Sequence, residues 1–390
     1  MANYISSNAN RFYAITESAY GQAAPVTAAN RFPAVKLQAQ QVLEGTKRFD
    51  KTGTRTFLGA PKTARRHTAF EVRSYLTSWP GSGEPGYGPL FRAGMGSISP
   101  QFVGALSIAT VQNPTQIQTT VPHGLSVGSG ISFSNEIRFV TGVIDSTTIS
   151  FNAGFSTTPV TGQSLSPALT YRLASALPSL TVYDYWDPTT TVSRMLTGAA
   201  VDTMDILVNG DYHEFAFSGP AADLVDSTSF TPGLGGMSTF PSEPAIGAFN
   251  YSIVPGHLGQ VWLGSLDSQF FTLTAANIEV KNHIDVRNQE FGSSYPRAIA
   301  PGMRQVSSRF SVFAQDDTQT NALYQAAKAR TLVSAMLQLG QQQSQLMGIF
   351  LPQVTPEIPI FNDSDTRLQW EFNSNLAQGT SDDELFIAFA

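Results

Sequence analysis

The feature that most restricts the fold of this chain is an order of elements that occurs twice along it. The order begins with a strand of alternating polar and apolar residues and continues with a polar loop, a second strand and a helical segment. It occurs in residues 35–93 and again in residues 278–327. Both halves then close with period-two strands, of which 213–217 and 384–389 are the clearest. A repeated element order predicts two domains of one type, each a β-sandwich or barrel with an α-helix on its flank.

The repeat sets the expected domain boundaries. The similar segments Val26–Asn30 and Leu273–Asn277 are expected to mark corresponding points in the two halves. Closely spaced short strands and turns interrupt the first half, which predicts a small all-β domain inserted at a surface loop. A segment with several Pro and Gly separates the halves and predicts an ordered linker. The expected parts are a discontinuous first domain in 1–104 and 169–225, the insert in 105–168, the linker in 226–250 and the second domain in 251–390.

Composition supports a mainly β fold and argues against tight binding of a DNA duplex. Charged residues form only 13% of the 390 residues, while the chain contains 32 Gly and 23 Pro, which suits short strands joined by many turns. The formal net charge is −6 at pH 7. Proteins that clasp a duplex neutralise its phosphates with clustered Lys and Arg, so we expect this acidic chain to repel DNA.

Cysteine usage and the N-terminal sequence bear on stability and location. The chain has no cysteine, so neither disulfides nor thiolate metal sites can stabilise its fold. The start, Met1–Ser6, lacks the basic and apolar regions of a signal peptide, and no apolar run approaches the roughly 18 residues that span a bilayer. We therefore expect synthesis and assembly in the cytosol, with no membrane contact.

No motif for catalysis, cofactor binding or metal binding fits its context. Residues 81–86 match G-x-G-x-x-G, but Pro85 opposes a helix start and the next acid is Glu136, so we favour a flexible turn over a dinucleotide site. Asp382 and Asp383 are expected to mark a turn, and no nucleophile elbow or P-loop occurs. We predict a protein that is not an enzyme and has no cofactor. The histidines lack metal-site spacing and are His67, His123, His213, His257 and His283.

Seven short segments outside the insert and the linker carry a family resemblance. Those of the second half are Glu290–Gly292, Leu323–Arg330, Met336–Gly340 and Gln378–Glu384. Those of the first half are Val182–Trp186, Gly198–Asp202 and Gly210–Phe215. Together they resemble the major tail tube proteins of long-tailed, siphovirus-type bacteriophages. The resemblance implies tube domains that join in a ring around a lumen, and rings that stack into the tail tube through which DNA is ejected into the host.

The resemblance also implies an oligomer and a set of partners. A ring of the family closes with six domains, so three copies of a two-domain chain would form a homotrimeric, pseudo-hexameric ring. The implied partners are other copies of the chain, the tape measure protein, and the tail terminator and tail-tip proteins. Genomic DNA is expected to pass through an electronegative or nearly neutral lumen without specific binding. The implied location is the virion tail, assembled in the host cytoplasm, with the insert on the tube exterior.

Two alternatives remain open at this stage. A distal tail or tail-tip ring protein would share the fold but end the stack. A carbohydrate-binding adhesin is suggested only by the insert. Filaments formed by the purified chain would favour the tube, single rings would favour the tail tip, and binding to glycans would favour the adhesin.

A loop from Gly45 to His67 gathers basic residues against the single acid Asp50. Its cations are Lys47, Arg48, Lys51, Arg55, Lys62, Arg65 and Arg66. A solvated loop and a nucleic-acid contact are possible interpretations, but we favour an arm that stacks on an acidic surface of the adjacent ring. A loop of this length without apolar periodicity is unusual in a compact domain unless it is functional or disordered. The second half has a similar, less basic loop from Arg287 to Arg304.

Overall fold

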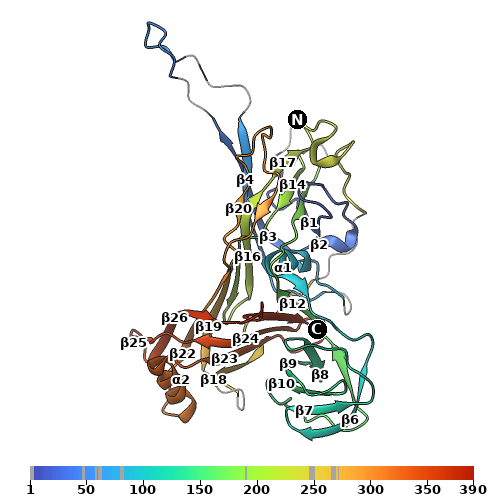
Figure 1. Ribbon diagram of the computed structural model, residues 1–390, viewed down its shortest axis with the longest axis vertical. Coiled ribbons are helices and arrows are strands. Elements are labelled where there is room, and N and C mark those ends of the chain that lie inside the picture. The colour runs from blue at the N-terminus through green and yellow to red at the C-terminus, as the bar shows by residue number, and fades with distance from the viewer. Residues whose placement is uncertain are drawn as a thin grey trace.

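The structure is a computed structural model that describes all of the chain except short gaps. The described part is mainly β, as the sequence predicted, and its α-helices are α1 (Gly88–Met95) and α2 (Thr318–Ala329) (Figure 1). It also contains two 3₁₀ turns, η1 (Ala28–Asn30) and η2 (Leu234–Gly236). The described residues are 4–45, 49–57, 59, 64–79, 83–188, 191–245, 251–264, 269–270 and 272–390.

Eight strands of the largest sheet form one antiparallel row that runs through both halves of the chain. We call this row the eight-strand sheet, and its order is β3-β4-β16-β15-β19-β22-β26-β25. The first half supplies β3 (Ala34–Glu44), β4 (Arg65–Tyr75), β16 (Glu214–Ala221) and β15 (Thr203–Val208). The second half supplies β19 (Leu273–Lys281), β22 (Gln305–Phe313), β26 (Gln369–Ala377) and β25 (Ile360–Asn362). Both sets of four therefore follow the same order, and β15 joins them by pairing with β19.

A β-bulge at the same place in both sets supports a residue-level correspondence between them. The register of β3 on β4 shifts between Ala34 and Lys36, and that of β19 on β22 shifts between Leu273 and Ala275. Bulges are specific features of a strand pair, so their agreement is a stronger sign of equivalence than strand order alone. The expectation that Val26–Asn30 corresponds to Leu273–Asn277 is wrong, because the first segment includes η1 and the second lies in β19.

Each half also contributes a second sheet, which packs on one face of the eight-strand sheet. In the first half its order is β2-β1-β13-β14-β17. These strands are β2 (Arg31–Phe32), β1 (Asn10–Thr16), β13 (Leu180–Trp186), β14 (Arg194–Ala199) and β17 (Asp223–Asp226). In the second half the order is β18-β23-β24-β27-β12-β5, and β24 also pairs with the end of β26, so this layer is continuous with the eight-strand sheet. These strands are β18 (Gly259–Gly264), β23 (Val333–Leu339), β24 (Met347–Thr355), β27 (Phe386–Phe389), β12 (Leu169–Leu173) and β5 (Gly96–Ile98). The last two come from residues expected in the first domain, so the first half of the chain supplies two strands of this sheet through the β12–β27 pairing.

Helix α1 lies in the core where the two halves meet. The ring of Phe91 contacts Phe215 and Phe217 of β16, at centroid distances of 5.0 and 5.2 Å, and Phe389 of β27 at 5.2 Å. Pro89 in the first turn suits a helix start, and Gly96 ends the helix at a φ of 105°, where a side chain would be strained. One buried aromatic cluster therefore holds elements of both halves together.

Helix α2 confirms the helix predicted in the second half. The Asp317 side chain caps it by accepting a 2.7 Å hydrogen bond from the backbone N–H of Thr320. Leu323 and Ala327 are buried on its inner side, and Arg330 ends it in the left-handed region. The helix contacts β18 at the outer end of the second half.

The strands between β5 and β12 close into a six-stranded barrel with the order β10-β7-β6-β11-β8-β9. They are β6 (Leu106–Asn113), β7 (Gln116–Thr119), β8 (Gly130–Phe133), β9 (Glu136–Val143), β10 (Thr148–Phe151) and β11 (Ser164–Pro167). The barrel has a small core of its own, which includes Ile117, Ile131 and Val140. Since β5 and β12 pair with each other and β12 pairs with β27, the barrel is attached to the sheet of the second half (Figure 1).

The outer faces of the two second sheets are covered by different segments. In the first half, Tyr13, Tyr183 and Tyr185 are buried beneath the linker segment that contains Phe230 and Phe240. In the second half, the barrel provides the cover, and its apolar contacts there include Phe139, Trp262, Phe350 and Phe386. The barrel is therefore part of the packing of the second half, and its removal would expose an apolar face.

Candidate functional site

The two outermost strands of the eight-strand sheet are open edges. Among the described residues, β3 pairs only with β4, and β25 pairs only with β26. Apolar side chains stand exposed at both edges, including Leu43 on β3, which is 64% exposed, and Ile360 on β25, which is 60% exposed. Edge strands with free backbone groups and exposed apolar side chains are templates for pairing with another chain. These two edges are the candidate site.

Strand direction makes the two edges complementary. Every neighbouring pair in the eight-strand sheet is antiparallel, so the two outermost strands of this even-numbered row run in opposite directions. A β3 strand of a second copy laid beside β25 would therefore also be antiparallel. The pairing between the two halves inside the chain is also antiparallel. There, Thr203–Val208 of β15 pair with Ala276–Lys281 of β19. The β15–β19 ladder thus shows how two such edges pair within the chain.

One face of the eight-strand sheet is buried against the second sheets and the other is polar. Ion pairs on the polar face join Arg73 to Glu71 at 2.5 Å and to Glu214 at 3.3 Å. Burial raises the pKa of Asp205, and the neighbouring charge of Glu279 raises it further. Acidic and basic side chains are close to balanced over the middle of this face. They are Glu71, Asp205, Glu214, Glu279 and Glu371 against Lys36, Arg73, Lys281 and Arg309.

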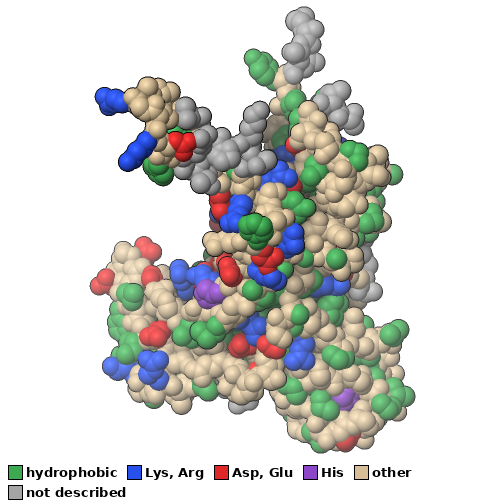
Figure 2. All heavy atoms as spheres, turned by 45° about the horizontal axis from the view of Figure 1, so that its top comes forward, with side chains coloured by type: hydrophobic (Ala, Val, Ile, Leu, Met, Phe, Trp, Pro, Cys, Tyr) green, Lys and Arg blue, Asp and Glu red, His purple; other side chains and the backbone are tan. Residues whose placement is uncertain are grey.

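The basic loop projects from one end of this sheet as an arm between β3 and β4. Lys51 and Arg55 are exposed on it, and Figure 2 shows Lys and Arg side chains on the projecting segment at its upper left. Lys47, Arg48 and Lys62 lie outside the described residues. We define the arm as residues 45–64, because β4 already begins at Arg65.

The two remaining predicted arm residues lie inside β4. The guanidinium of Arg66 pairs with the carboxylate of Asp223 at 2.8 Å, and the side-chain amide of Gln41 donates to the same carboxylate. Arg65 donates to the backbone carbonyl of Gln289 at 3.4 Å, in the loop of the second half. Both residues therefore anchor the base of the arm, and the two long loops of the chain lie together at this end of the sheet.

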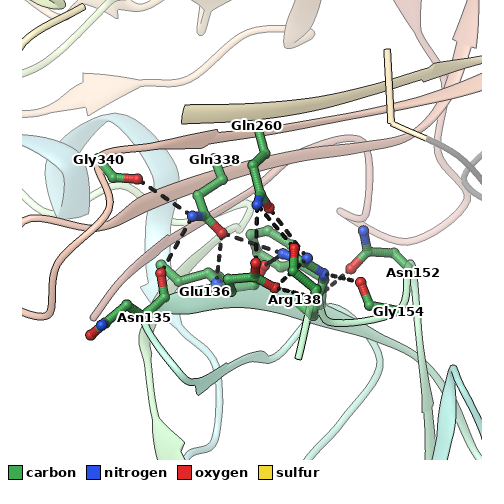
Figure 3. Close-up of polar contacts among 11 residues, drawn as sticks. Asn135, Glu136, Arg138, Asn152, Gly154, Gln260, Gln338 and Gly340 are labelled. Carbon is green, nitrogen blue, oxygen red and sulfur yellow. Dashed lines mark hydrogen bonds and ion pairs between the residues drawn. The ribbon is translucent and has the colours of Figure 1, made fainter. Parts of the chain in front are cut away.

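A buried polar network holds the barrel against the second half (Figure 3). The Arg138 side chain is fully buried, and its guanidinium donates to Glu136 at 2.7 Å and to Gln338 at 3.3 Å. It also lies 4.3 Å from the ring centroid of Trp262, in cation–π geometry. The side-chain amide of Gln260 donates to Glu136 at 3.0 Å. Strands distant in the sequence thus share one network.

The charges of this network remain paired near neutral pH. Burial lowers the pKa of Arg138 to about 10, and Glu136 opposes that shift. Burial acts to raise the pKa of Glu136, but hydrogen bonds from Ser156 and the charge of Arg138 outweigh it and lower the pKa. The network was not predicted from the sequence, although an arginine inside the apolar run Ile137–Val140 is a usable signal.

The histidines do not gather, and His213 has the least usual surroundings. It is 1% exposed and neither ring nitrogen has a hydrogen-bond partner among the described residues. Burial lowers its pKa to about 4. It lines a cavity of about 360 Å³ between the β15–β16 connection and β18, together with Asn209 and Gln338. His123, by contrast, is bonded to the backbone of Leu125 and Asp145.

The glycine motif and the acidic pair, which the sequence offered as possible chemical sites, make structural contacts. Glu84, within the glycine motif, accepts hydrogen bonds from Tyr171 at 2.7 Å and from Arg92. Asp383 accepts backbone hydrogen bonds from Thr380 and Ser381, which fits the predicted turn. Within the described ranges, no group of three or more metal-ligating side chains occurs. No helix found there combines the length and apolarity needed to cross a membrane.

No protein-family model matches the chain, and no curated protein is significantly similar to it. The features of the chain that bear on its function are the sequence segments and the geometry of the edges, the polar face and the arm.

Loss of the Arg138 guanidinium should destabilise the protein. Arg138→Met leaves the largely buried Glu136 carboxylate without its cation, and we expect a loss of about 3–5 kcal/mol in the free energy of unfolding. Adding Glu136→Gln should recover part of that loss, because it removes the unpaired charge. Denaturant unfolding measures both, with Arg309→Met on the exposed polar face as the control. Equal losses in the single and double variants would show that ion pairing is not the cause.

His213 should make stability depend on pH. Its folded-state pKa lies below the ordinary value of 6.5, so protons bind the unfolded state first and stability falls as the pH drops from about 6.5 to 4. At pH 4 the loss of unfolding free energy that is due to His213 amounts to about 3 kcal/mol. His213→Leu should remove it, whereas His257→Leu, at an exposed position, should behave like the wild type. Urea unfolding at pH 7 and pH 4 measures the difference, and identical pH dependence in wild type and His213→Leu would refute the assignment.

Proposed function

We propose that this chain is a structural protein whose copies join edge to edge into closed rings that stack into a hollow tube, the tail tube of a long-tailed phage. The observation that carries the proposal is the β15–β19 joint. It joins two equivalent four-strand sets and leaves an equivalent, complementary edge at each end of the sheet. A head-to-tail contact of this kind forms a ring when its rotation closes.

The sheet geometry favours three copies in a ring. Three copies of the eight-strand sheet make a barrel of roughly 24 strands, whose backbone diameter is about 48 Å at 4.8 Å spacing and 40° tilt. Two copies would give about 32 Å, which side chains from opposite walls narrow to roughly the width of a duplex. Three copies therefore suit a conduit for DNA better than two.

Charge and packing suggest which face lines the lumen. Within the described residues, the apolar core lies on the other face of the eight-strand sheet, and the acids and bases of the polar face are nearly balanced. A wall of this kind can let a duplex slide, since strong binding needs clustered cations that neutralise phosphates. The second sheets, the linker and the barrel all lie on the opposite face. In the proposed tube they form the exterior.

The projecting arm favours a stacking ring over a ring that ends the tail. An exposed segment with unbalanced positive charge at one end of the sheet suits a contact with the next ring. The tape measure protein would then occupy the lumen during assembly, and the terminator and tail-tip proteins would close the two ends. No catalytic step is needed for any of these roles.

Blocking one edge should stop ring formation without unfolding the subunit. Ile358→Lys with Ile360→Lys places two charges at the β25 edge, where the native residues are 54% and 60% exposed. Like Lys residues on natural edge strands, they should prevent pairing with a second copy. We expect the variant to remain monomeric with wild-type circular dichroism. Analytical ultracentrifugation and electron microscopy measure its assembly.

The matched control is Val160→Lys, an equally exposed apolar position on the barrel and far from both edges in sequence and sheet order. It should assemble like the wild type. Tubes formed by the edge variant at the wild-type rate would argue against edge-to-edge rings. Single wild-type rings that never elongate would instead favour a tail-tip ring.

A further inference from the structure

His213 is a buried imidazole without a hydrogen-bond partner among the residues that the structure describes. It is 1% exposed, and neither Nδ1 nor Nε2 is bonded there. Buried polar side chains are nearly always hydrogen-bonded, because burying such a group without a partner costs free energy. The imidazole therefore indicates a polar contact that the chain does not make with itself.

The imidazole lines a cavity whose walls are held in place by backbone contacts. The cavity lies between the β15–β16 connection and β18. The N–H of Leu76 donates to the carbonyl of His213 at 2.9 Å, and the N–H of Gly256 donates to the carbonyl of Asp211 at 2.8 Å. A Cβ on Gly256 would overlap the carbonyl oxygen of Asn209, so this close approach requires glycine. The cavity is therefore preformed, as small-molecule sites usually are.

Charged side chains do not contribute to the described lining of the cavity. The lining residues include no Asp, Glu, Lys or Arg. Burial lowers the pKa of His213 to about 4, so its ring is neutral near pH 7. An ion in this space would lose its hydration without meeting a side chain of opposite charge. The lining therefore suits an uncharged molecule better than an anion or a metal ion.

Polar and apolar side chains share the walls around the imidazole. Val208, Leu258 and Leu339 supply apolar surface, and the amide of Gln338 is already bonded to the barrel (Figure 3). A neutral imidazole offers one donor and one acceptor, and a hydroxyl group can complement either. A ring that carries several hydroxyl groups and C–H faces would satisfy both ring nitrogens and pack on the apolar walls.

The volume of the cavity limits its ligand to a small molecule. The cavity measures about 360 Å³, near the lower end, about 300 Å³, of the range for small-molecule sites. The same volume of water holds about twelve molecules at roughly 30 Å³ each. A hexose, which also has about twelve non-hydrogen atoms, matches this space, whereas an oligosaccharide or a peptide segment exceeds it.

We propose that this cavity binds an uncharged, hydroxylated molecule of monosaccharide size, whose hydroxyl groups bond to the ring nitrogens of His213. The site lies outside the barrel, and the proposal is independent of ring or tube formation. Typical binding energies per atom for small ligands give a dissociation constant on the order of millimolar for about twelve atoms.

Saturation-transfer NMR on the full chain tests the proposal, because the method detects millimolar ligands on proteins of any size. The probes are D-glucose, D-galactose and D-mannose. At least one of them should give a signal that saturates below about 100 mM, roughly 100-fold the expected dissociation constant. His213→Leu should weaken that binding at least tenfold. The control is His283→Asn, an exposed position outside the cavity with a φ of 48° that asparagine tolerates.

A second measurement needs no substitution at the cavity. In the Ile358→Lys with Ile360→Lys chain, which is expected to be monomeric, a saturating hexose should shift the ring-nitrogen NMR signals of the histidine that titrates near pH 4. No saturable signal from any of the three hexoses, the result for a cavity that takes up only water, would overturn the proposal. Binding that is unchanged in His213→Leu would also overturn it, as would a response of that histidine to Zn²⁺ and not to hexose.

Discussion

The hydrogen-bonded ladder between β15 and β19 is the constraint on which the rest of the structure depends. It turns two separate four-strand sets into one sheet, and it fixes the direction and register of everything on either side. Because the two sets are equivalent, the ladder satisfies one edge of each and leaves one edge of each open. A chain with two complementary open edges and no partner is at risk of uncontrolled pairing. The proposed closure into a ring would remove that risk, since a closed barrel has no edges.

The remaining elements cover one face of this sheet in successive layers. The second sheets bury one of its faces, and their own outer surfaces are covered by the linker in the first half and by the barrel in the second. The two covers are unrelated in fold, which indicates that each outer face needed burial but not a particular partner. Arg138 explains why the barrel is more than an apolar lid. Its hydrogen bonds to Gln338 and Glu136 require one orientation, so the barrel is held in a fixed position rather than on a flexible stem.

Local patterns in the sequence predicted local structure well. Strand periodicity indicated the mainly β fold, and the charges around α2 located that helix near its observed bounds. Pairing between distant strands was not predictable, because alternation shows which face of a strand is buried but not which strand lies beside it. Arg65 and Arg66 were placed in the arm for a related reason: polar residues at the start of β4 look like loop residues until Asp223 and Gln289 are seen beside them. The short match at Val26–Asn30 failed because five similar residues do not determine a conformation.

Disulfide trapping tests the central claim most directly, and the absence of native cysteine leaves no competing thiol. The shared bulge makes Gln40 of β3 the counterpart of Glu279 of β19, and the matching strand order makes Ile360 of β25 the counterpart of Asp205 of β15. Because Asp205 pairs with Glu279 inside the chain, Ile360 of one chain should lie opposite Gln40 of the next. Antiparallel neighbours lie within disulfide range. Oxidised Ile360→Cys/Gln40→Cys protein should therefore run as a covalent trimer in denaturing gels, whereas Ile360→Cys/Gln38→Cys, two residues out of register, should not. Monomers only, or equal crosslinking of both variants, would contradict the account.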